Sequence, residues 1–357
     1  MAIIAELNEF RKIYGQGFIK GVFTGIDNIM LYLGLIKKSR GPLAIGWDVT
    51  FNCNARCSFC DVWKMKGKGK ELTTKECIGI IRQAGRAKTW AISFTGGEPL
   101  LRPDICILIN EAKKQGINVN INTNGSLLKN RAKELVASGV DTITVSLDSH
   151  DPDVHNSVRG FKGLFEKAEQ GISEIRKLRK DRRPHLMARF TVNKRNYKGI
   201  QPYIEYWKDK VDKVTLQPVY EGESTSFFHI KDKGIMFEEK DRKEFTDYFT
   251  RLLKRYKWFN KIYYKEFPTF FFQKKELQKR YRCFSPYFYL VIDAYGNAFP
   301  CAMLIRNFGS LREKSLKQVW NSREVNSFRR MIKQRKNRCF CWSTDSIIST
   351  YLSRILR

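Results

Sequence analysis

Short apolar runs alternate with charged amphipathic segments between residues 43 and 220. The apolar runs, which are typical of buried strands, cover residues 43–51, 89–97, 117–125, 142–149, 185–193 and 213–220. Segments such as 73–87 and 130–140 lie between them and are typical of amphipathic helices. This alternation predicts βαβ units and a parallel sheet. About six units fit, too few for a closed eight-unit barrel unless the C-terminal third supplies the rest.

The first 42 residues have a different pattern. Their apolar stripe recurs at helical spacing, with basic residues on either side, and consists of Phe10, Ile13, Phe18, Val22, Ile26, Ile29, Leu33 and Ile36. Such a helix either packs on the protein or lies in a membrane interface. Acidic residues and lysines interrupt every run that could span a bilayer, so we expect no transmembrane helix.

The chain loses the strand–helix period after residue 225. Residues 238–282 are dense in aromatic and basic residues, and 287–301 predict a hairpin that turns at Tyr295-Gly296-Asn297. We therefore expect an amphipathic helical segment over 1–42 and an α/β core over 43–225. A helical extension and a smaller domain would follow over 226–357.

Charge and cysteine content narrow the class of protein. The 357 residues carry a formal charge of +30, which favours an anionic partner, namely nucleic acid, phosphorylated small molecules or an acidic membrane. A compositional bias of the source is the alternative reading. Nine cysteines, clustered and without a secretory leader, suit metal ligation in a reducing compartment better than disulfides. These features predict a cytoplasmic protein, with peripheral contact to the inner membrane face as a variant.

Three cysteines follow the first predicted strand in the stretch TFNCNARCSFCDVW. Cys53, Cys57 and Cys60 cannot share a regular strand, whose side chains alternate between faces, so a loop must present them. Zinc would require a fourth ligand, which the adjacent sequence lacks. A [4Fe–4S] cluster held by three thiolates leaves one iron open and suggests chemistry at the cluster rather than electron transfer alone. A fourth ligand from distant sequence is the alternative.

Polar groups also follow the next three strands, in TGGEP, NTNG and SLDS. The carboxyl ends of parallel strands meet at one edge of a sheet, which predicts a common site there. C-x3-C-x2-C with Phe59 before its last cysteine, then GGEP, TNG and SLD…H…RG in this order, resembles the radical S-adenosylmethionine (radical SAM) enzymes over residues 43–220.

The resemblance implies a partial (β/α)6 barrel with a smaller C-terminal auxiliary-cluster domain. It implies a [4Fe–4S] cluster on the cysteine triplet, with S-adenosylmethionine chelated at its open iron. One electron, from a reductase such as flavodoxin or ferredoxin, would give a 5′-deoxyadenosyl radical that abstracts hydrogen from a substrate. No catalytic residue beyond the cluster ligands is assigned.

Several residues are expected to hold the cofactor. Two glycines would let the backbone approach its methionine moiety. Glu98 would hold the cationic end or only favour a helix N-terminus, Ser146 and Asp148 would meet the ribose, and Arg189 would pair with the carboxylate. The full expected set is Phe59, Gly96, Gly97, Glu98, Pro99, Asn122, Asn124, Ser146, Asp148, Arg189 and Gln217.

A second set of cysteines lies near the C-terminus: Cys283, Cys301, Cys339 and Cys341. With G-x4-C and the stretch GSLREKSLKQVWNS, it resembles the SPASM domain of radical SAM enzymes or its shorter twitch form. The last pair is C-x-C, where the family more often has C-x2-C. Four thiolates imply one auxiliary [4Fe–4S] cluster, and a structural zinc is the alternative. Cys77 and Cys106 are predicted to be core thiols.

The substrate class stays open among three. The charge and the N-terminal segment favour an anionic small molecule or a lipid-linked substrate. SPASM relatives often modify peptides, which makes a peptide precursor the second class. RNA is the third and is disfavoured, because no RNA-binding module is visible. An iron–sulfur electron carrier is the non-enzymatic alternative, against which the polar strand ends argue.

Overall fold

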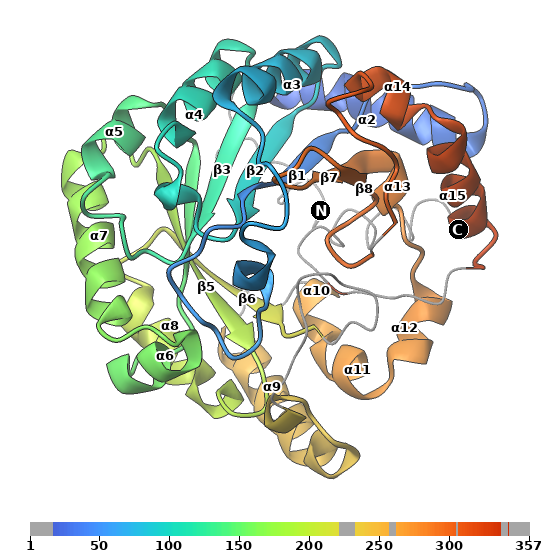
Figure 1. Cartoon of the computed structure of the whole chain (residues 1–357). Coiled ribbons are helices and arrows are strands. Elements are labelled where there is room, and N and C mark those ends of the chain that lie inside the picture. Colours follow the sequence, from blue (N-terminus) through green and yellow to red (C-terminus); the bar gives the residue numbers. More distant parts are fainter. Residues whose placement is uncertain (1–16, 221–232, 257–261, 305, 337–341, 343–357) are drawn as a thin grey trace.

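A mostly parallel sheet forms the centre of the molecule (Figure 1). The computed structural model describes residues 17–220, 233–256, 262–304, 306–336 and 342, with side chains from residue 21 onward. The six predicted strands are all present as β1 (Ala44–Thr50), β2 (Ala91–Gly96), β3 (Asn118–Thr123), β4 (Thr142–Ser146), β5 (His185–Val192) and β6 (Lys213–Pro218). Each pairs in parallel with the next, so the partial-barrel prediction is confirmed and the sheet does not close.

The helices between these strands cover one face of the sheet. They are α3 (Thr74–Arg86), α4 (Ile105–Lys114), α5 (Ala132–Ala137), α6 (Pro152–Arg159), α7 (Leu164–Leu178) and α8 (Ile200–Trp207). Local sequence fixes where they begin. The α3 helix starts at a capping box in which the Thr73 hydroxyl accepts from the backbone N–H of Glu76 and the Glu76 carboxylate accepts from that of Thr73.

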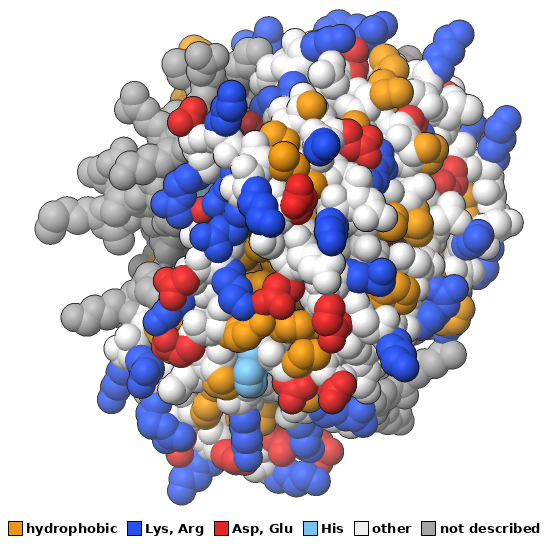
Figure 2. All heavy atoms as spheres, turned by 90° about the vertical axis from the view of Figure 1, so that its left-hand side faces the viewer, with side chains coloured by type: hydrophobic (Ala, Val, Ile, Leu, Met, Phe, Trp, Pro, Cys, Tyr) orange, Lys and Arg blue, Asp and Glu red, His pale blue; other side chains and the backbone are white. Residues whose placement is uncertain are grey.

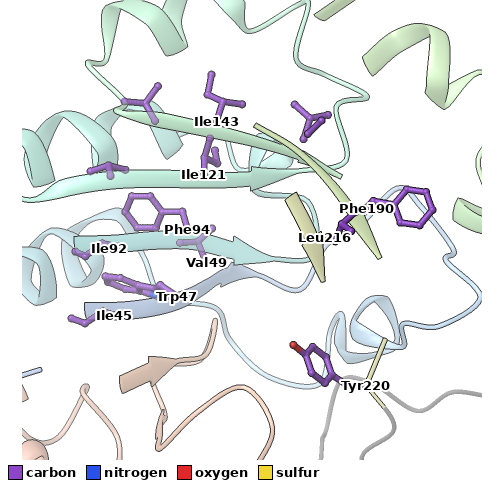
Figure 3. Close-up of a cluster of buried hydrophobic side chains, with 14 of the residues drawn as sticks. Ile45, Trp47, Val49, Ile92, Phe94, Ile121, Ile143, Phe190, Leu216 and Tyr220 are labelled. Carbon is purple, nitrogen blue, oxygen red and sulfur yellow. The ribbon is translucent and has the colours of Figure 1, made fainter. Parts of the chain in front are cut away.

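Alternate residues of every strand form the core between sheet and helices. Ile45, Trp47 and Val49 of β1 point to this side, as do Phe94 of β2 and Ile143 of β4, and all are fully buried (Figure 3). Because strand side chains alternate, the intervening residues face the concave side, called the lumen below. In β1 to β6 these lumen residues are mainly polar and half-buried.

The C-terminal region extends the sheet at its β1 edge. The predicted hairpin is present as β7 (Tyr289–Ile292) and β8 (Ala298–Phe299), and β7 pairs in parallel with β1. Gly296 adopts a φ of +92° in the turn, which a residue with a Cβ rarely does. The carboxylate of Asp293 accepts from the backbone N–H of Tyr295 and Asn297 and so fixes the turn.

The aromatic-rich segment folds into helices beside the barrel. They are α9 (Arg242–Arg255), α10 (Ile262–Lys265), α11 (Phe267–Phe272) and α12 (Lys274–Arg280), followed by α13 (Ser285–Phe288), α14 (Leu316–Trp320) and α15 (Arg323–Lys333). Phe249 stacks on Phe267 with ring centroids 5.2 Å apart. The interleaved aromatic residues therefore build a core here.

The N-terminal helix α2 (Gly17–Leu33) packs on the rest of the molecule, as one of the two predictions for it stated. Leu31 and Tyr32 are buried against Phe284, Tyr287 and Phe288 of the α13 segment. Residues 1–16 of the predicted stripe, including Phe10 and Ile13, lie outside the described residues. None of the described helices combines the length and the apolar character needed to cross a bilayer.

Candidate functional site

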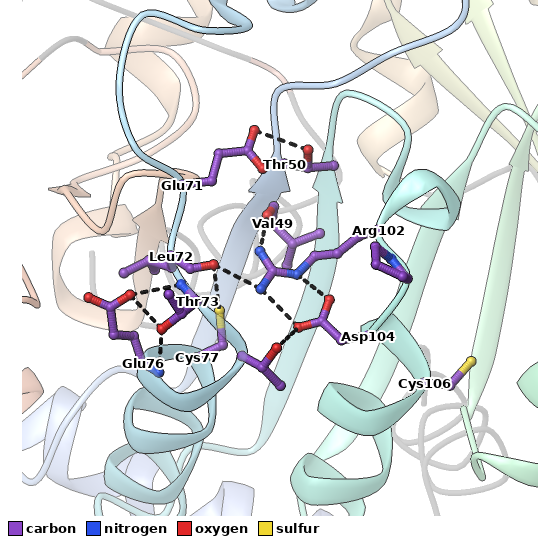
Figure 4. A network of polar contacts seen from close by, with 12 residues as sticks. Val49, Thr50, Glu71, Leu72, Thr73, Glu76, Cys77, Arg102, Asp104 and Cys106 are labelled. Atoms are coloured by element: carbon purple, nitrogen blue, oxygen red, sulfur yellow. Dashed lines mark hydrogen bonds and ion pairs between the residues drawn. The ribbon is translucent and has the colours of Figure 1, made fainter.

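The cysteine loop leaves the carboxyl end of β1, and a polar network fixes the point where it leaves (Figure 4). The buried guanidinium of Arg102 donates to the carbonyls of Val49 and Leu72 at 2.8 and 2.9 Å, and Asp104 balances its charge. One carboxylate oxygen of Glu71 accepts from the Thr50 hydroxyl and from the backbone N–H of Phe51. The loop therefore starts from a rigid base.

The three predicted thiols lie close enough together to affect one another's ionisation. Burial raises the pKa of Cys53 to about 11 and that of Cys60 to about 12, and the neighbouring thiolates add to both shifts. The pKa of Cys57 is also raised by burial, against the opposing charge of Arg159. The three thiols are half-buried, and a metal centre bound by them would displace their protons.

Among the described residues, no three Cys, His, Asp or Glu side chains are grouped so as to hold a single metal ion. A polynuclear cluster is larger than one ion and accommodates thiolates that are further apart. The assignment of the triplet to such a cluster stays a prediction.

The glycine pair after β2 brings its backbone against the start of the cysteine loop. The N–H of Gly97 donates to the Thr50 carbonyl at 2.7 Å, and that of Glu98 donates to the Asn52 carbonyl at 2.8 Å. A Cβ on Gly96 would lie 2.5 Å from the Thr50 carbonyl oxygen, and one on Gly97 would lie 2.1 Å from that of Asn52. Only glycine permits this close approach, so the pair shapes the cysteine loop as well as any cofactor cradle.

The carboxylate of Glu98 is fully buried and occupied by the chain itself. One oxygen accepts from the Thr123 hydroxyl and the Leu100 backbone N–H, and the other from the Asn124 N–H at 2.7 Å. Glu98 thus joins the ends of β2 and β3, and Pro99, also buried, starts the turn that follows. Contact between Glu98 and the cationic end of the cofactor stays a prediction.

Asp148 is likewise fully buried. Its oxygens accept from the backbone N–H of Thr191 at 2.9 Å and from Nε of Arg159 at 2.7 Å. A second guanidinium nitrogen of Arg159 donates to Sγ of Cys57 at 3.9 Å. Asp148 therefore acts on the cysteine loop through Arg159, and its contact with the ribose stays a prediction.

The rest of the SLD…H…RG pattern supports the same arrangement. The C-terminal carbonyls of α6, at Val158 and Arg159, accept from the N–H groups of Ser58 and Arg56 in the cysteine loop. Gly160 ends the helix at a φ of +57°, where a Cβ would lie 2.5 Å from the Arg56 carbonyl oxygen. We call Asp148, Arg159 and Gly160 the loop clamp. Arg159 is part of the sequence motif, but the sequence alone predicted no role for it.

His155 completes the clamp as a neutral residue. Its Nδ1 accepts from the backbone N–H of Asp148 at 3.1 Å, and burial, with the Arg159 charge, lowers its pKa to about 4. The side chain therefore stays uncharged at neutral pH and positions the backbone of Asp148.

Two other predicted residues also contact the cysteine loop. The Asn124 amide donates to the Asn54 side-chain carbonyl at 2.9 Å, so it fixes the loop residue next to Cys53. Phe59 is buried against Val219 and Ile235, and the Arg159 guanidinium lies 5.3 Å from its ring centroid. Both are placed to support the loop, and direct contact with the cofactor stays a prediction for them.

The remaining predicted residues face the lumen. Arg189 of β5 donates to the Asn122 carbonyl oxygen of β3 at 3.2 Å, and the Asn122 amide donates to the Ser93 hydroxyl of β2. Nε of Arg189 is buried without a hydrogen-bond partner among the described residues. Ser146 and Gln217 end β4 and β6 on the same half-buried face. An unpaired Nε beside an open polar face suits an incoming carboxylate, the role predicted for Arg189.

A carboxyl group that sequence reasoning missed lies in the same lumen. The side chain of Asp48 on β1 makes no hydrogen bond or ion pair within the described part of the chain. Burial raises its pKa to about 7, and the charge of Asp293, the residue that follows β7, adds to the shift. The only sequence signal was a single acidic residue in an otherwise apolar strand.

We expect Asp48→Asn to stabilise the protein at alkaline pH. An aspartate whose folded-state pKa is about 7 keeps its proton while the unfolded chain ionises, so stability is lost as pH rises from about 4 to about 7. The amide removes this loss, and the advantage should grow from near zero at pH 4 to about 1–3 kcal/mol at pH 8. Thermal unfolding midpoints of the anaerobic protein measure it, with exposed Asp209→Asn as control. An advantage that does not change with pH would contradict the assignment.

The structure describes half of the late cysteine set. Cys283 and Cys301 flank the β7–β8 hairpin and are half-buried, whereas Cys339 and Cys341 lie outside the described residues. Trp342 follows them in sequence and is anchored: its Nε1 donates to the Tyr263 carbonyl, and its own carbonyl accepts from the Tyr220 hydroxyl, both at 2.7 Å. Cys77 on α3 is buried and Cys106 on α4 packs against the core, as predicted.

Family models match both cysteine regions. The model for the radical SAM superfamily matches residues 47–197, and that for an iron–sulfur cluster-binding domain, SPASM, matches residues 283–342. The chain thus carries a domain of the radical SAM superfamily over residues 47–197, followed by a SPASM domain. It is therefore an enzyme, and its cofactors are S-adenosylmethionine, a [4Fe–4S] cluster on the radical SAM domain and auxiliary iron–sulfur on the SPASM domain.

Individual relatives agree with this placement. The AdoMet-dependent heme synthase of Methanosarcina barkeri is 26% identical over 329 residues, which cover 85% of this chain and 89% of the synthase. The probable GTP 3′,8-cyclase of Sulfolobus acidocaldarius is 33% identical over 193 residues, 52% of this chain and 60% of the cyclase. Streptococcus suis SuiB, solved bound to its precursor peptide SuiA, superimposes with a TM-score of 0.62 at 18% identity, over 88% of this chain and 71% of SuiB. The last similarity concerns the fold.

The residues at the radical SAM site fit its cofactors. Cys53, Cys57 and Cys60 are half-buried thiols on a loop that the clamp and the glycine pair hold, and a cluster would replace their protons. The lumen beside them offers the partly unpaired Arg189 guanidinium. Direct contacts with S-adenosylmethionine stay predictions for the whole expected set, and Arg189, whose Nε has no partner among the described residues, suits its carboxylate.

Proposed function

We propose that this radical SAM enzyme oxidises an anionic substrate that binds in the polar lumen between the two cysteine regions. When bound, the cluster and S-adenosylmethionine supply a 5′-deoxyadenosyl radical that abstracts a hydrogen atom. The observation that carries the proposal is the position of β1. The cysteine loop begins at its carboxyl end, and its neighbour β7 leads through the hairpin to Cys301.

Different residues of this chain have different roles in the proposed reaction. The loop clamp and the glycine pair hold the three thiolates, while Arg189 and Asn122 orient an anionic group in the lumen. Asp48 faces the lumen between the two cysteine regions and has no partner among the described residues, which suits a group that contacts substrate and accepts a proton during oxidation. Auxiliary iron–sulfur on the late cysteines would take the electron that such an oxidation releases.

An anionic small molecule is the first candidate substrate. The formal charge is +30, and in Figure 2 basic side chains are spread over the side of the molecule that carries the barrel helices, with acidic ones between them. Such a field attracts anions in general. The heme synthase, which matches over most of this chain, and the GTP cyclase are both named for small molecules. A peptide is the second candidate, favoured by the fold shared with peptide-bound SuiB.

Deuterium transfer can separate these candidates. The reconstituted enzyme, with dithionite and S-adenosylmethionine, would be given three fractions of a deuterated cell extract: acidic small molecules, lipids and peptides. Abstraction of deuterium from a true substrate enriches 5′-deoxyadenosine by one mass unit. We expect enrichment with the acidic or lipid fraction, whereas enrichment with peptides alone would favour the second candidate. Failure to form any 5′-deoxyadenosine would contradict the radical function itself.

Replacing one of the two late cysteines that the structure describes should distinguish the two iron sites by their iron content and activity. We expect Cys301→Ser or Cys283→Ser to lower iron from about eight to about four per chain, because one four-iron cluster loses a ligand. Formation of 5′-deoxyadenosine without substrate should continue, since the triplet is untouched. Iron analysis with product assay measures both. Zinc at wild-type stoichiometry, with about four irons, would instead support a structural metal at the late set.

The proposed partners follow from the charge and the redox chemistry. An acidic one-electron carrier such as flavodoxin or ferredoxin would dock favourably on a protein of charge +30. We propose a reducing cytoplasmic setting, consistent with the clustered thiols, and contact with the inner membrane face.

A further inference from the structure

The helix α2 exposes apolar side chains and buries polar ones. Its inner face buries Thr24 and Asn28, which donate to the carbonyls of Lys88 at 2.8 Å and Gly41 at 3.3 Å, beside the apolar Leu31 and Tyr32 described above. Its outer face carries apolar side chains, where a helix that only packed on a domain would carry polar ones.

The exposed apolar side chains of the molecule concentrate on this segment. In the part of the chain that the structure describes, eight large hydrophobic residues are exposed, and five of them lie between residues 22 and 35. They are Val22 at 43%, Phe23 at 57%, Ile26 at 47%, Leu33 at 48% and Leu35 at 69% exposure. A Cβ placed on Gly25, beside them, would meet no described atom within 4 Å. We call these five residues the apolar row. An exposed row of this kind indicates an interaction surface.

Basic residues adjoin the apolar row. Lys37, Lys38 and Arg40 follow it directly and are exposed, and Asp27 on the helix pairs with Arg40 at 3.1 Å. Apolar side chains rimmed by lysine and arginine suit a membrane interface that contains anionic headgroups. A second copy of the chain suits it less well, because each copy would bring a charge of +30 to the contact.

We propose that α2 is an interfacial anchor whose apolar row inserts into the surface of an anionic lipid bilayer. The helix would lie in the plane of the membrane, with Thr24 and Asn28 still bound to the domain and Lys37 and Lys38 at the headgroups. This inference does not depend on the proposed reaction, since it concerns a surface outside the lumen.

Vesicle flotation tests the anchor with the full chain. Vesicles of equal parts phosphatidylglycerol and phosphatidylcholine, at moderate salt, should float the wild-type protein, and pure phosphatidylcholine vesicles should float it at least tenfold less. Phe23→Ser with Ile26→Ser should reduce binding about tenfold or more, because two apolar side chains no longer insert. Both positions are exposed, so folding should be unaffected. Unchanged 5′-deoxyadenosine formation would verify that.

Matched control variants carry substitutions of the same kind at exposed positions outside the α2 segment. Ile107→Ser alters an equally exposed residue on α4, at 56% exposure, and should leave binding unchanged. Lys37→Glu with Lys38→Glu should weaken binding about tenfold, whereas Lys133→Glu with Lys167→Glu, on α5 and α7 on the other side of the molecule in Figure 1, should weaken it much less.

Three results would overturn the anchor. The first is a wild-type protein that does not float with anionic vesicles. The second is binding that Phe23→Ser with Ile26→Ser leaves intact, which would assign it to another surface. The third is a dimer in sedimentation analysis that this double variant dissociates while vesicle binding persists, which would make the row a contact between copies.

Discussion

Replacing any one of Cys53, Cys57 and Cys60 by alanine should reduce 5′-deoxyadenosine formation to background. A three-thiolate cluster that loses one ligand has two, and the loop sequence from residue 50 to residue 63 contains no fourth cysteine to replace it. We expect iron to fall by about four per chain. Anaerobic reconstitution followed by iron and sulfide analysis measures the cluster, and product after dithionite and S-adenosylmethionine measures the chemistry.

Two cysteines of the same chain provide the control. Cys77→Ala on α3 and Cys106→Ala on α4 remove thiols that pack in or against the core. They should lower stability modestly and leave iron and product unchanged. If a triplet variant still made 5′-deoxyadenosine at the wild-type rate, the assignment of the triplet as the cluster ligands would be wrong.

The barrel was predictable from sequence because its signals are local. Apolar runs and amphipathic segments alternate within a few residues of each other, and each of the six predicted strands is present. The hairpin was predictable for the same reason, since its turn has a glycine at the required position. A cluster loop could be recognised because three thiols within eight residues are typical of metal or cluster ligation.

Side-chain roles at the strand ends were less predictable. Glu98 and Asp148 stand where a cofactor ligand would, but their partners are decided by the packing of neighbouring strands, which the sequence does not display. Burial raises the pKa of Asp48, and Asp293 adds to the shift although it is distant in sequence and becomes a neighbour only through the β1–β7 pairing. A sequence motif alone therefore does not show which distant side chains become its neighbours in the fold, and these neighbours decide the role of each residue.

The second large effect is expected at Arg159, the centre of the loop clamp. Arg159→Gln leaves the fully buried Asp148 carboxylate without its cation, which costs about 3–5 kcal/mol. It also removes the donor to Cys57, so the cluster should be harder to reduce, because hydrogen bonds and positive charge near the thiolates stabilise the reduced state. Thermal unfolding gives the first quantity, and a redox titration followed by electron paramagnetic resonance gives the second.

A double variant separates these two contributions of Arg159. In Arg159→Gln with Asp148→Asn, the unpaired buried charge is gone, so much of the stability should return. The reduction potential should stay more negative than in the wild type, since the donor to Cys57 is still missing. Arg242→Gln, which breaks the exposed ion pair with Glu239, is the matched control and should cost less than about 1 kcal/mol. Recovery of both stability and potential in the double variant would mean that Arg159 only neutralises Asp148 and has no direct effect on the cluster.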